Sequence, residues 1–82
     1  MATITVYTKP QCFGCGKTIE KFRAAGLDLR TVDLTTSPAA LEYVSEELGY
    51  AQAPVVVVDD DNRWSGLNPG KIQQVIDAAK ES

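Results

Sequence analysis

Hydrophobic residues recur with two different spacings in the first half of the chain, and the spacing changes where the predicted structure changes. Residues 3–8 are rich in β-branched and aromatic side chains, which predicts a strand ended by Lys9 and Pro10. A helical spacing follows, with an apolar face formed by Cys15, Ile19, Phe22 and Gly26. Gly26 also supplies a helix stop, and residues 29–34 alternate between apolar and polar side chains, as a second strand does.

The second half of the chain predicts a helix, a β-hairpin and a final helix. Ser37 is a suitable N-cap before Pro38, and Gly49 ends a helix whose apolar stripe consists of Leu41, Val44 and Leu48. Residues 55–58 are four consecutive valines, a pattern typical of a central strand that is covered on both faces. An acidic turn at residues 59–62 leads to a short strand at residues 63–65. A last amphipathic helix begins near Pro69, and its buried side consists of Ile72, Val75, Ile76 and Ala79.

The predicted order is βαβαββα, which describes an α/β protein with helices on both faces of a small mixed sheet. A chain of 82 residues has room for one domain with a modest core, so we expect a single domain over residues 1–82. Apolar residues make up 44% and charged residues 23% of the chain, and no apolar stretch is long enough to cross a membrane. The first residues lack the basic and apolar segments of a secretory signal, which favours a cytoplasmic location.

Charge is distributed unevenly along the chain. Residues 1–30 carry five basic and two acidic side chains, whereas residues 31–62 carry seven acidic side chains and no basic one. The net charge of −3 argues against nucleic acid as a partner. The basic part of the chain predicts a positive rim that a docking protein meets near the cysteines, although surface charges also segregate without function.

The two cysteines of the chain, Cys12 and Cys15, lie three positions apart at the predicted junction between a strand and a helix. A thiolate is favoured at a helix start, where unpaired N–H groups and the positive end of the helix dipole face the sulfur. Cys12 has that position, and Cys15, one turn later, can attack a mixed disulfide formed at Cys12. In a reducing compartment such a pair is more often catalytic or metal-binding than structural. The alternatives are two small buried hydrophobic residues or a structural disulfide.

Three segments together resemble thioredoxin-fold redoxins of the glutaredoxin type and, among them, the NrdH-redoxins, which donate electrons to class Ib ribonucleotide reductase. Residues 6–15 (VYTKPQCFGC) match the active-site segment, residues 53–56 (APVV) the cis-proline segment, and residues 64–66 (WSG) a later signature. The segments follow the family's order and span nearly the whole chain. The resemblance implies a minimal thioredoxin fold with a four-stranded mixed sheet and three helices. It also implies a monomer with no bound cofactor, whose redox-active group is a Cys12–Cys15 disulfide.

The resemblance further implies partner contacts around the cysteines. The residues that it assigns to these contacts are Lys9, Pro10, Phe13, Ala53, Pro54, Trp64, Ser65 and Gly66. The resemblance implies a cis bond before Pro54, which would leave the preceding backbone free to pair with an extended partner segment, whereas the sequence alone favours a trans proline that opens a strand. The resemblance implies that Trp64, Ser65 and Gly66 help to shape the surface beside the active site and tie two loops together, although an aromatic residue such as Trp64 is also a normal core residue. Lys9 either supports the thiolate, contacts a partner or is solvated.

Residues 65–69 (SGLNP) contain no carboxylate, whereas typical glutaredoxins meet the amino group of glutathione there with acidic residues. The resemblance therefore implies weak glutathione recognition, with thioredoxin reductase as the NADPH-dependent electron donor and ribonucleotide reductase as the target. The chain departs from the family at Gly14, where Gln is common, and at Leu67-Asn68, where Phe-Arg is common. These differences concern the choice of partner rather than the dithiol chemistry.

Several alternative functions stay open at this point. A glutathione-dependent glutaredoxin would keep the fold and change the reductant. A copper carrier also uses a Cys-X-X-Cys pair, since two thiolates suit Cu(I), but such domains have a βαββαβ order and a Met where this chain has Pro10. A mononuclear zinc site lacks ligands, because the chain has no His and two Cys. An iron–sulfur cluster shared between two chains, and a binding module without redox chemistry, are the remaining alternatives.

Overall fold

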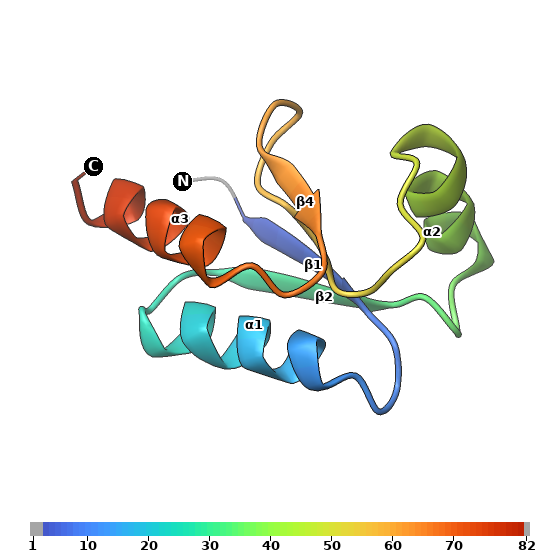
Figure 1. Ribbon diagram of the computed structural model, residues 1–82, viewed down its shortest axis with the longest axis horizontal. Coiled ribbons are helices and arrows are strands. Elements are labelled where there is room, and N and C mark those ends of the chain that lie inside the picture. The colour runs from blue at the N-terminus through green and yellow to red at the C-terminus, as the bar shows by residue number, and fades with distance from the viewer. Residues whose placement is uncertain (1–2, 82) are drawn as a thin grey trace.

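Four strands form one mixed sheet in the order β2-β1-β3-β4 in the computed structural model, which describes residues 3–81 (Figure 1). The elements in chain order are β1 (Ile4–Thr8), α1 (Phe13–Ala24), β2 (Leu29–Asp33), α2 (Pro38–Glu42), the π-helical segment η1 (Tyr43–Glu47), β3 (Val55–Val57), β4 (Arg63–Ser65) and α3 (Pro69–Glu81). The predicted order βαβαββα is therefore confirmed, with η1 continuing the second helix. The single domain predicted over residues 1–82 includes residues 1, 2 and 82, which lie outside the described residues.

The directions of the strands bring distant loops to one edge of the sheet. β1 and β2 are parallel, and α1 connects them, whereas β3 is antiparallel to both β1 and β4. Tyr7, near the end of β1, pairs with Val55 at the start of β3, and Val55 pairs with Ser65 at the end of β4. The loop after β1, the loop before β3 and the loop after β4 consequently meet at the same edge.

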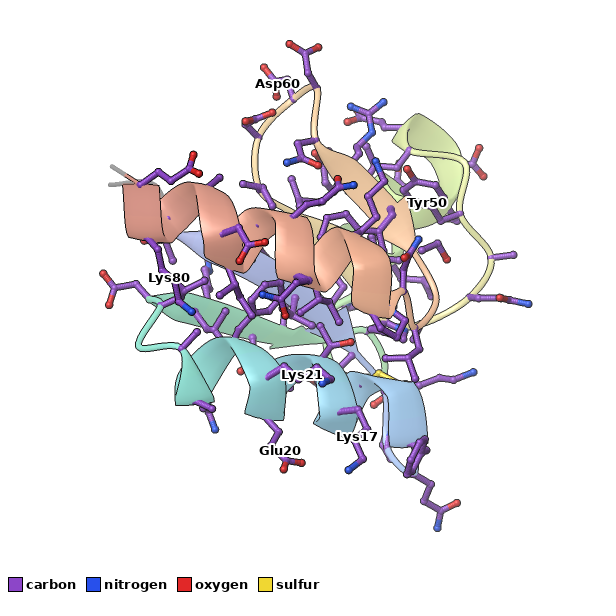
Figure 2. All side chains as sticks on the ribbon, turned by 60° about the vertical axis from the view of Figure 1, so that its left-hand side comes forward. Lys17, Glu20, Lys21, Tyr50, Asp60 and Lys80 are labelled. Carbon is purple, nitrogen blue, oxygen red and sulfur yellow. A yellow bond between two sulfur atoms is a disulfide. The ribbon has the colours of Figure 1, made fainter. Side chains whose placement is uncertain are left out.

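The core lies between the sheet and the pair formed by α1 and α3. Its buried members are Ile4, Val6, Phe22, Val56, Trp64, Ile72, Val75 and Ile76. Figure 2 shows α1 and α3 over the same face of the sheet, with Lys17 and Glu20 of α1 directed away from it. The predicted apolar faces of both helices are thus largely confirmed, because Cys15 and Phe22 of α1 are buried. Sequence periodicity missed Thr18, which is also fully buried in α1.

The second helix covers only the end of the other face of the sheet. The ring of Tyr43 lies 6.1 Å from the ring of Tyr7, which points to the face opposite Val6. Ser37 caps this helix as predicted, since its hydroxyl accepts a hydrogen bond from the Ala40 amide at 3.3 Å.

The buried stripe predicted for the second helix is wrong at Leu41, which is 49% exposed, and right at Val44, which is buried. The reason is the position of α2, which carries Leu41 and buries none of its residues, whereas η1, where the helix continues, buries Val44. Leu41 and Val44 lie on the same side of the helix, but only Val44 is covered. None of the helices within residues 3–81 is both long and apolar enough to cross a membrane.

Candidate active site

Cys12 is the N-cap residue of α1, at the sheet edge where the three loops meet. Its backbone is extended, with φ −105° and ψ 106°, and Gln11 before it turns the chain with a φ of 59°. The sulfur of Cys12 accepts a hydrogen bond from the backbone amide of Cys15 at 3.1 Å. An N-cap side chain normally binds this amide through oxygen, so here a sulfur takes the place of the usual cap. The same N–H group and the positive end of α1 favour negative charge on the Cys12 sulfur.

Cys12 and Cys15 are joined by a disulfide, and their Cα atoms are 5.2 Å apart. The two sulfurs differ in accessibility, because Cys15 is only 3% exposed whereas Cys12 is half-buried. A partner molecule can therefore reach the sulfur of Cys12 more readily than that of Cys15. This asymmetry suits a pair in which the first cysteine reacts with a partner and the second reacts internally.

Pro54 lies against the start of α1. The Ala53–Pro54 peptide bond is cis, and the ring of Pro54 is fully buried. A Cβ atom added to Gly14 would lie 3.2 Å from Cδ of Pro54, which measures how closely the proline approaches the segment between the two cysteines. The structure thus brings the predicted proline and the cysteine pair together.

The segment at residues 64–66 connects β4 to the loop that carries Pro54. The hydroxyl of Ser65 donates to the carbonyl of Gln52 at 2.7 Å, and the amide of Gly66 donates to the carbonyl of Pro54 at 2.7 Å. Gly66 has a φ of 87°, a backbone conformation that favours glycine. These two bonds fix the loop before β3 relative to β4.

Trp64 belongs to the core rather than to the surface beside the cysteines. It is 6% exposed and packs with the residues that α1 and α3 bury. Its Nε1 atom has no hydrogen-bond partner among the described residues. The placement corresponds to the alternative that the sequence left open, an aromatic residue that closes a small sheet, so we assign no direct partner contact to Trp64.

Exposed residues surround Cys12 on the surface. Lys9 and Pro10 precede it and are exposed, and Phe13, which follows it, is 73% exposed with Nζ of Lys17 5.7 Å from its ring centre. Leu67, which the sequence marked as a departure from the family but not as a site residue, is 40% exposed and lies beside Gly14. The sequence feature that could have indicated a contact residue here is a large hydrophobic side chain directly after Gly66.

A groove of about 350 Å³ lies between the second helix and the loop before β3. Its lining includes Lys9, Leu41, Val44, Gln52 and Ala53. The exposed Leu41 is thus one wall of a groove that reaches the residue preceding Pro54. An extended partner segment beside Ala53 would have room for a side chain here.

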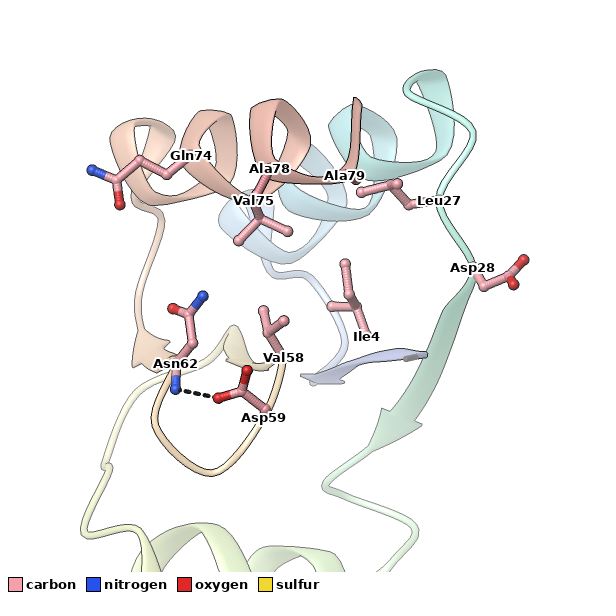
Figure 3. Close-up of a pocket in the computed structure, with 10 residues that line it drawn as sticks. All are labelled: Ile4, Leu27, Asp28, Val58, Asp59, Asn62, Gln74, Val75, Ala78 and Ala79. Atoms are coloured by element: carbon pink, nitrogen blue, oxygen red, sulfur yellow. Dashed lines mark hydrogen bonds between the residues drawn. The ribbon is translucent and has the colours of Figure 1, made fainter. Parts of the chain in front are cut away.

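A second cavity, of about 460 Å³, lies at the opposite edge of the sheet (Figure 3). Ile4, at the start of β1, and Ala78, near the end of α3, line it, whereas Cys12 follows the end of β1. On its rim the Asp59 carboxylate accepts a hydrogen bond from the backbone N–H of Asn62 at 2.9 Å. This cavity is therefore separate from the candidate site.

Two titratable groups near the site are shifted. The hydroxyl and amide of Thr35 both donate to the Asp33 carboxylate, at 2.6 and 2.8 Å, and lower the pKa of Asp33 from its ordinary value. Burial, and next the neighbouring Tyr43, raise the pKa of Tyr7, while Arg30 opposes this shift. Within residues 3–81 no group of three or more His, Cys, Asp or Glu side chains is arranged to hold a metal ion.

Comparison with protein families gives a match to the glutaredoxin family over residues 4–62. The Gene 56 protein of Mycobacterium phage L5 is 38% identical over 93% of this chain and 74% of the relative. The glutaredoxin-like protein NrdH of Escherichia coli is 32% identical over 88% of this chain and 86% of the relative. These matches include the segments that carry both cysteines and Pro54.

Among solved structures, the chain is similar to NrdH-redoxin from Escherichia coli, a glutaredoxin-like protein described as having a thioredoxin-like activity profile. The two share 32% identity with a TM-score of 0.81, over 89% of this chain and 93% of the other. Glutaredoxin from Archaeoglobus fulgidus is similar with 26% identity and a TM-score of 0.78, over 93% of this chain and 87% of the other. The thioredoxin fold expected from the sequence is confirmed.

Proposed function

This chain belongs to the glutaredoxin family, among its NrdH-like members, and from this membership we propose that it carries electrons from thioredoxin reductase to the disulfide of a target protein. It is a thiol–disulfide oxidoreductase. The observation that carries the proposal is the position of Cys12, whose partly exposed sulfur lies at the start of α1 with the Cys15 amide 3.1 Å away. The reduced pair would work in a reducing compartment such as the cytoplasm.

The proposed reaction has two steps. The thiolate of Cys12 attacks one sulfur of the target disulfide, and the other target sulfur leaves as a thiolate that takes up a proton. The Cys15 thiol then loses its proton and attacks the Cys12 sulfur, which releases the second target sulfur. The target gains two electrons and two protons, and the redoxin ends as the Cys12–Cys15 disulfide. Thioredoxin reductase returns this disulfide to the dithiol with two electrons from NADPH.

The surrounding residues have supporting roles in this proposal. Ala53 offers backbone groups to an extended segment of the target, and Pro54 holds that backbone beside the cysteines. Lys9, Pro10 and Phe13 are exposed next to Cys12, where a docking protein touches them. Ser65 and Gly66 act indirectly, since their hydrogen bonds position the loop that carries Pro54.

We propose thioredoxin reductase as the reductant because residues 65–69 of the chain lack a charged partner for glutathione. Residues 65–69 contain no carboxylate to pair with the amino group of glutathione. The similar NrdH-redoxin from Escherichia coli has a thioredoxin-like activity profile. We propose class Ib ribonucleotide reductase as the target, with the chain acting as a monomer.

The reductant is tested by following NADPH consumption during reduction of insulin disulfides. We expect faster turnover with thioredoxin reductase than with glutathione and glutathione reductase. Faster turnover with glutathione would replace the proposed reductant and leave the oxidoreductase chemistry in place.

The order of the two cysteines is tested with ribonucleotide reductase of class Ib as the target. Cys15→Ser should accumulate a mixed disulfide between Cys12 and the target, visible as a larger species on a non-reducing gel. Cys12→Ser is the matched control and should form none. Equal trapping by both variants would contradict the assigned roles.

A further inference from the structure

Gly14 lies so close to two neighbouring residues that a side chain cannot be added to it without movement. A Cβ at this position would be 3.2 Å from Cδ of Pro54 and 3.2 Å from Cβ of Leu67, closer than normal van der Waals contact. Gly16, two residues further along α1, differs, because a Cβ there meets no atom within 4 Å. The missing side chain at Gly14 is therefore what allows Leu67 to lie against the first turn of α1.

Leu67 is the neighbour that would yield to a side chain at position 14. Pro54 is fully buried, and its carbonyl accepts a hydrogen bond from Gly66 at 2.7 Å. Leu67 is instead 40% exposed and lies in the loop between β4 and α3. A longer residue at position 14 would thus displace Leu67 and cover the surface that it forms.

Phe13, which directly precedes Gly14, and Leu67, which lies against Gly14, both expose apolar surface. Within residues 3–81 the strongly exposed large hydrophobic residues are Phe13, Leu41 and Leu67. Phe13 is the first residue of α1, and Leu67 lies against the first turn of this helix. The Lys17 ammonium lies 5.7 Å from the centre of the Phe13 ring. A target disulfide that reaches Cys12 brings its own neighbouring residues over this surface.

We propose that Gly14 and Leu67 form a specificity-determining pair that selects protein disulfides flanked by an apolar side chain. The inference rests on the proposed function and names the class of disulfide that this site prefers. Gly14 keeps Leu67 in place and leaves a shallow apolar surface between Leu67 and Phe13. An aliphatic or aromatic side chain next to the target cysteine is removed from water there, whereas a polar one gains nothing.

The test uses two short peptides whose single cysteine is bonded to thionitrobenzoate, with either Leu or Ser next to that cysteine. Attack by the reduced protein on the peptide sulfur releases the coloured thiolate, so the second-order rate constant is read directly. We expect the parent protein to react roughly three- to tenfold faster with the Leu peptide, as partial burial of one aliphatic side chain allows. Gly14→Gln and Leu67→Ala should each bring this ratio close to one.

Gly16→Gln is the matched control, since it adds the same side chain to the same helix without a contact, and it should keep the parental ratio. The double variant with Gly14→Gln and Leu67→Ala should give no further loss, because both changes remove one surface. Equal rates of the parent with both peptides, or a parental ratio in Gly14→Gln, would overturn the inference while leaving the proposed function intact. A parent protein that reacts with neither peptide would instead count against the proposed function. Should thermal unfolding show Gly14→Gln to be unfolded, Leu67→Ala decides alone, since it only removes atoms.

Discussion

Replacing Gly16 with alanine should stabilise the protein, and the size of the effect follows from the structure. Gly16 is an exposed residue inside α1, its φ is not in the left-handed region, and a Cβ there meets no atom within 4 Å. Glycine in a helix interior is about 0.5–1 kcal/mol less favourable than alanine. With no new contact to offset it, Gly16→Ala should raise the free energy of unfolding by about that amount. In a domain of this size the melting temperature should rise by roughly 2–8 °C.

The stability of Gly14→Ala is the matched comparison for Gly16→Ala. Gly14→Ala gains part of the same helix propensity, but its Cβ would lie 3.2 Å from both Pro54 and Leu67. Overpacking at a tight contact offsets or exceeds the gain. Thermal unfolding followed by circular dichroism, on reduced and on oxidised protein, should therefore rank Gly16→Ala above the parent and Gly14→Ala below Gly16→Ala. A Gly16→Ala variant that melts below the parent would refute the reasoning about the helix, and equal stabilisation at both positions would refute the close approach at Gly14.

Three further predictions concern residues outside this pair. Phe22 is completely buried, so Phe22→Ala should lower the free energy of unfolding by about 3–5 kcal/mol in urea denaturation, and a loss well below 1 kcal/mol would show that the core rearranges around it. Hydrogen bonds from Thr35 hold the pKa of Asp33 below its ordinary value. The stability that the ionised Asp33 contributes is therefore complete above the ordinary pKa and is lost as the pH falls through the lowered pKa of the folded protein. Thr35→Val should bring the Asp33 pKa closer to its ordinary value in a carboxyl NMR titration, and an unchanged titration would contradict the assigned hydrogen bond. Ser65→Ala removes the hydrogen bond to the Gln52 carbonyl and should lower the free energy of unfolding by about 0.5–1 kcal/mol in the same urea experiment. A variant as stable as the parent would mean that this exposed hydrogen bond contributes nothing to stability.

The periodicity of the sequence predicted the elements well because both spacings depend on local geometry. The run of valines beginning at Val55 identified a strand that is flanked by β1 and β4, and the two valines that open it are fully buried. The pattern failed at Leu41, which belongs to a short helix that buries none of its residues, because the spacing of residues does not show where the covering surface ends. The sequence also left open whether Trp64 is a core residue, and the structure places it in the core with residues of α3, because tertiary packing decides which face of a short strand is covered.

The sequence by itself determined the reactive group and its position in the fold. Two cysteines three residues apart, after a strand and before a helix, place Cys12 at the amide-rich helix start whatever the rest of the chain does, because capping depends on neighbouring residues. Only the tertiary structure decided what surrounds that group. Gly14, Pro54 and Leu67 are far apart along the chain and meet because β3 runs antiparallel to β1 and β4, a pairing that depends on how the whole sheet buries its apolar side chains. The chemistry is therefore local to a few residues, whereas the surface that selects the partner depends on long-range packing.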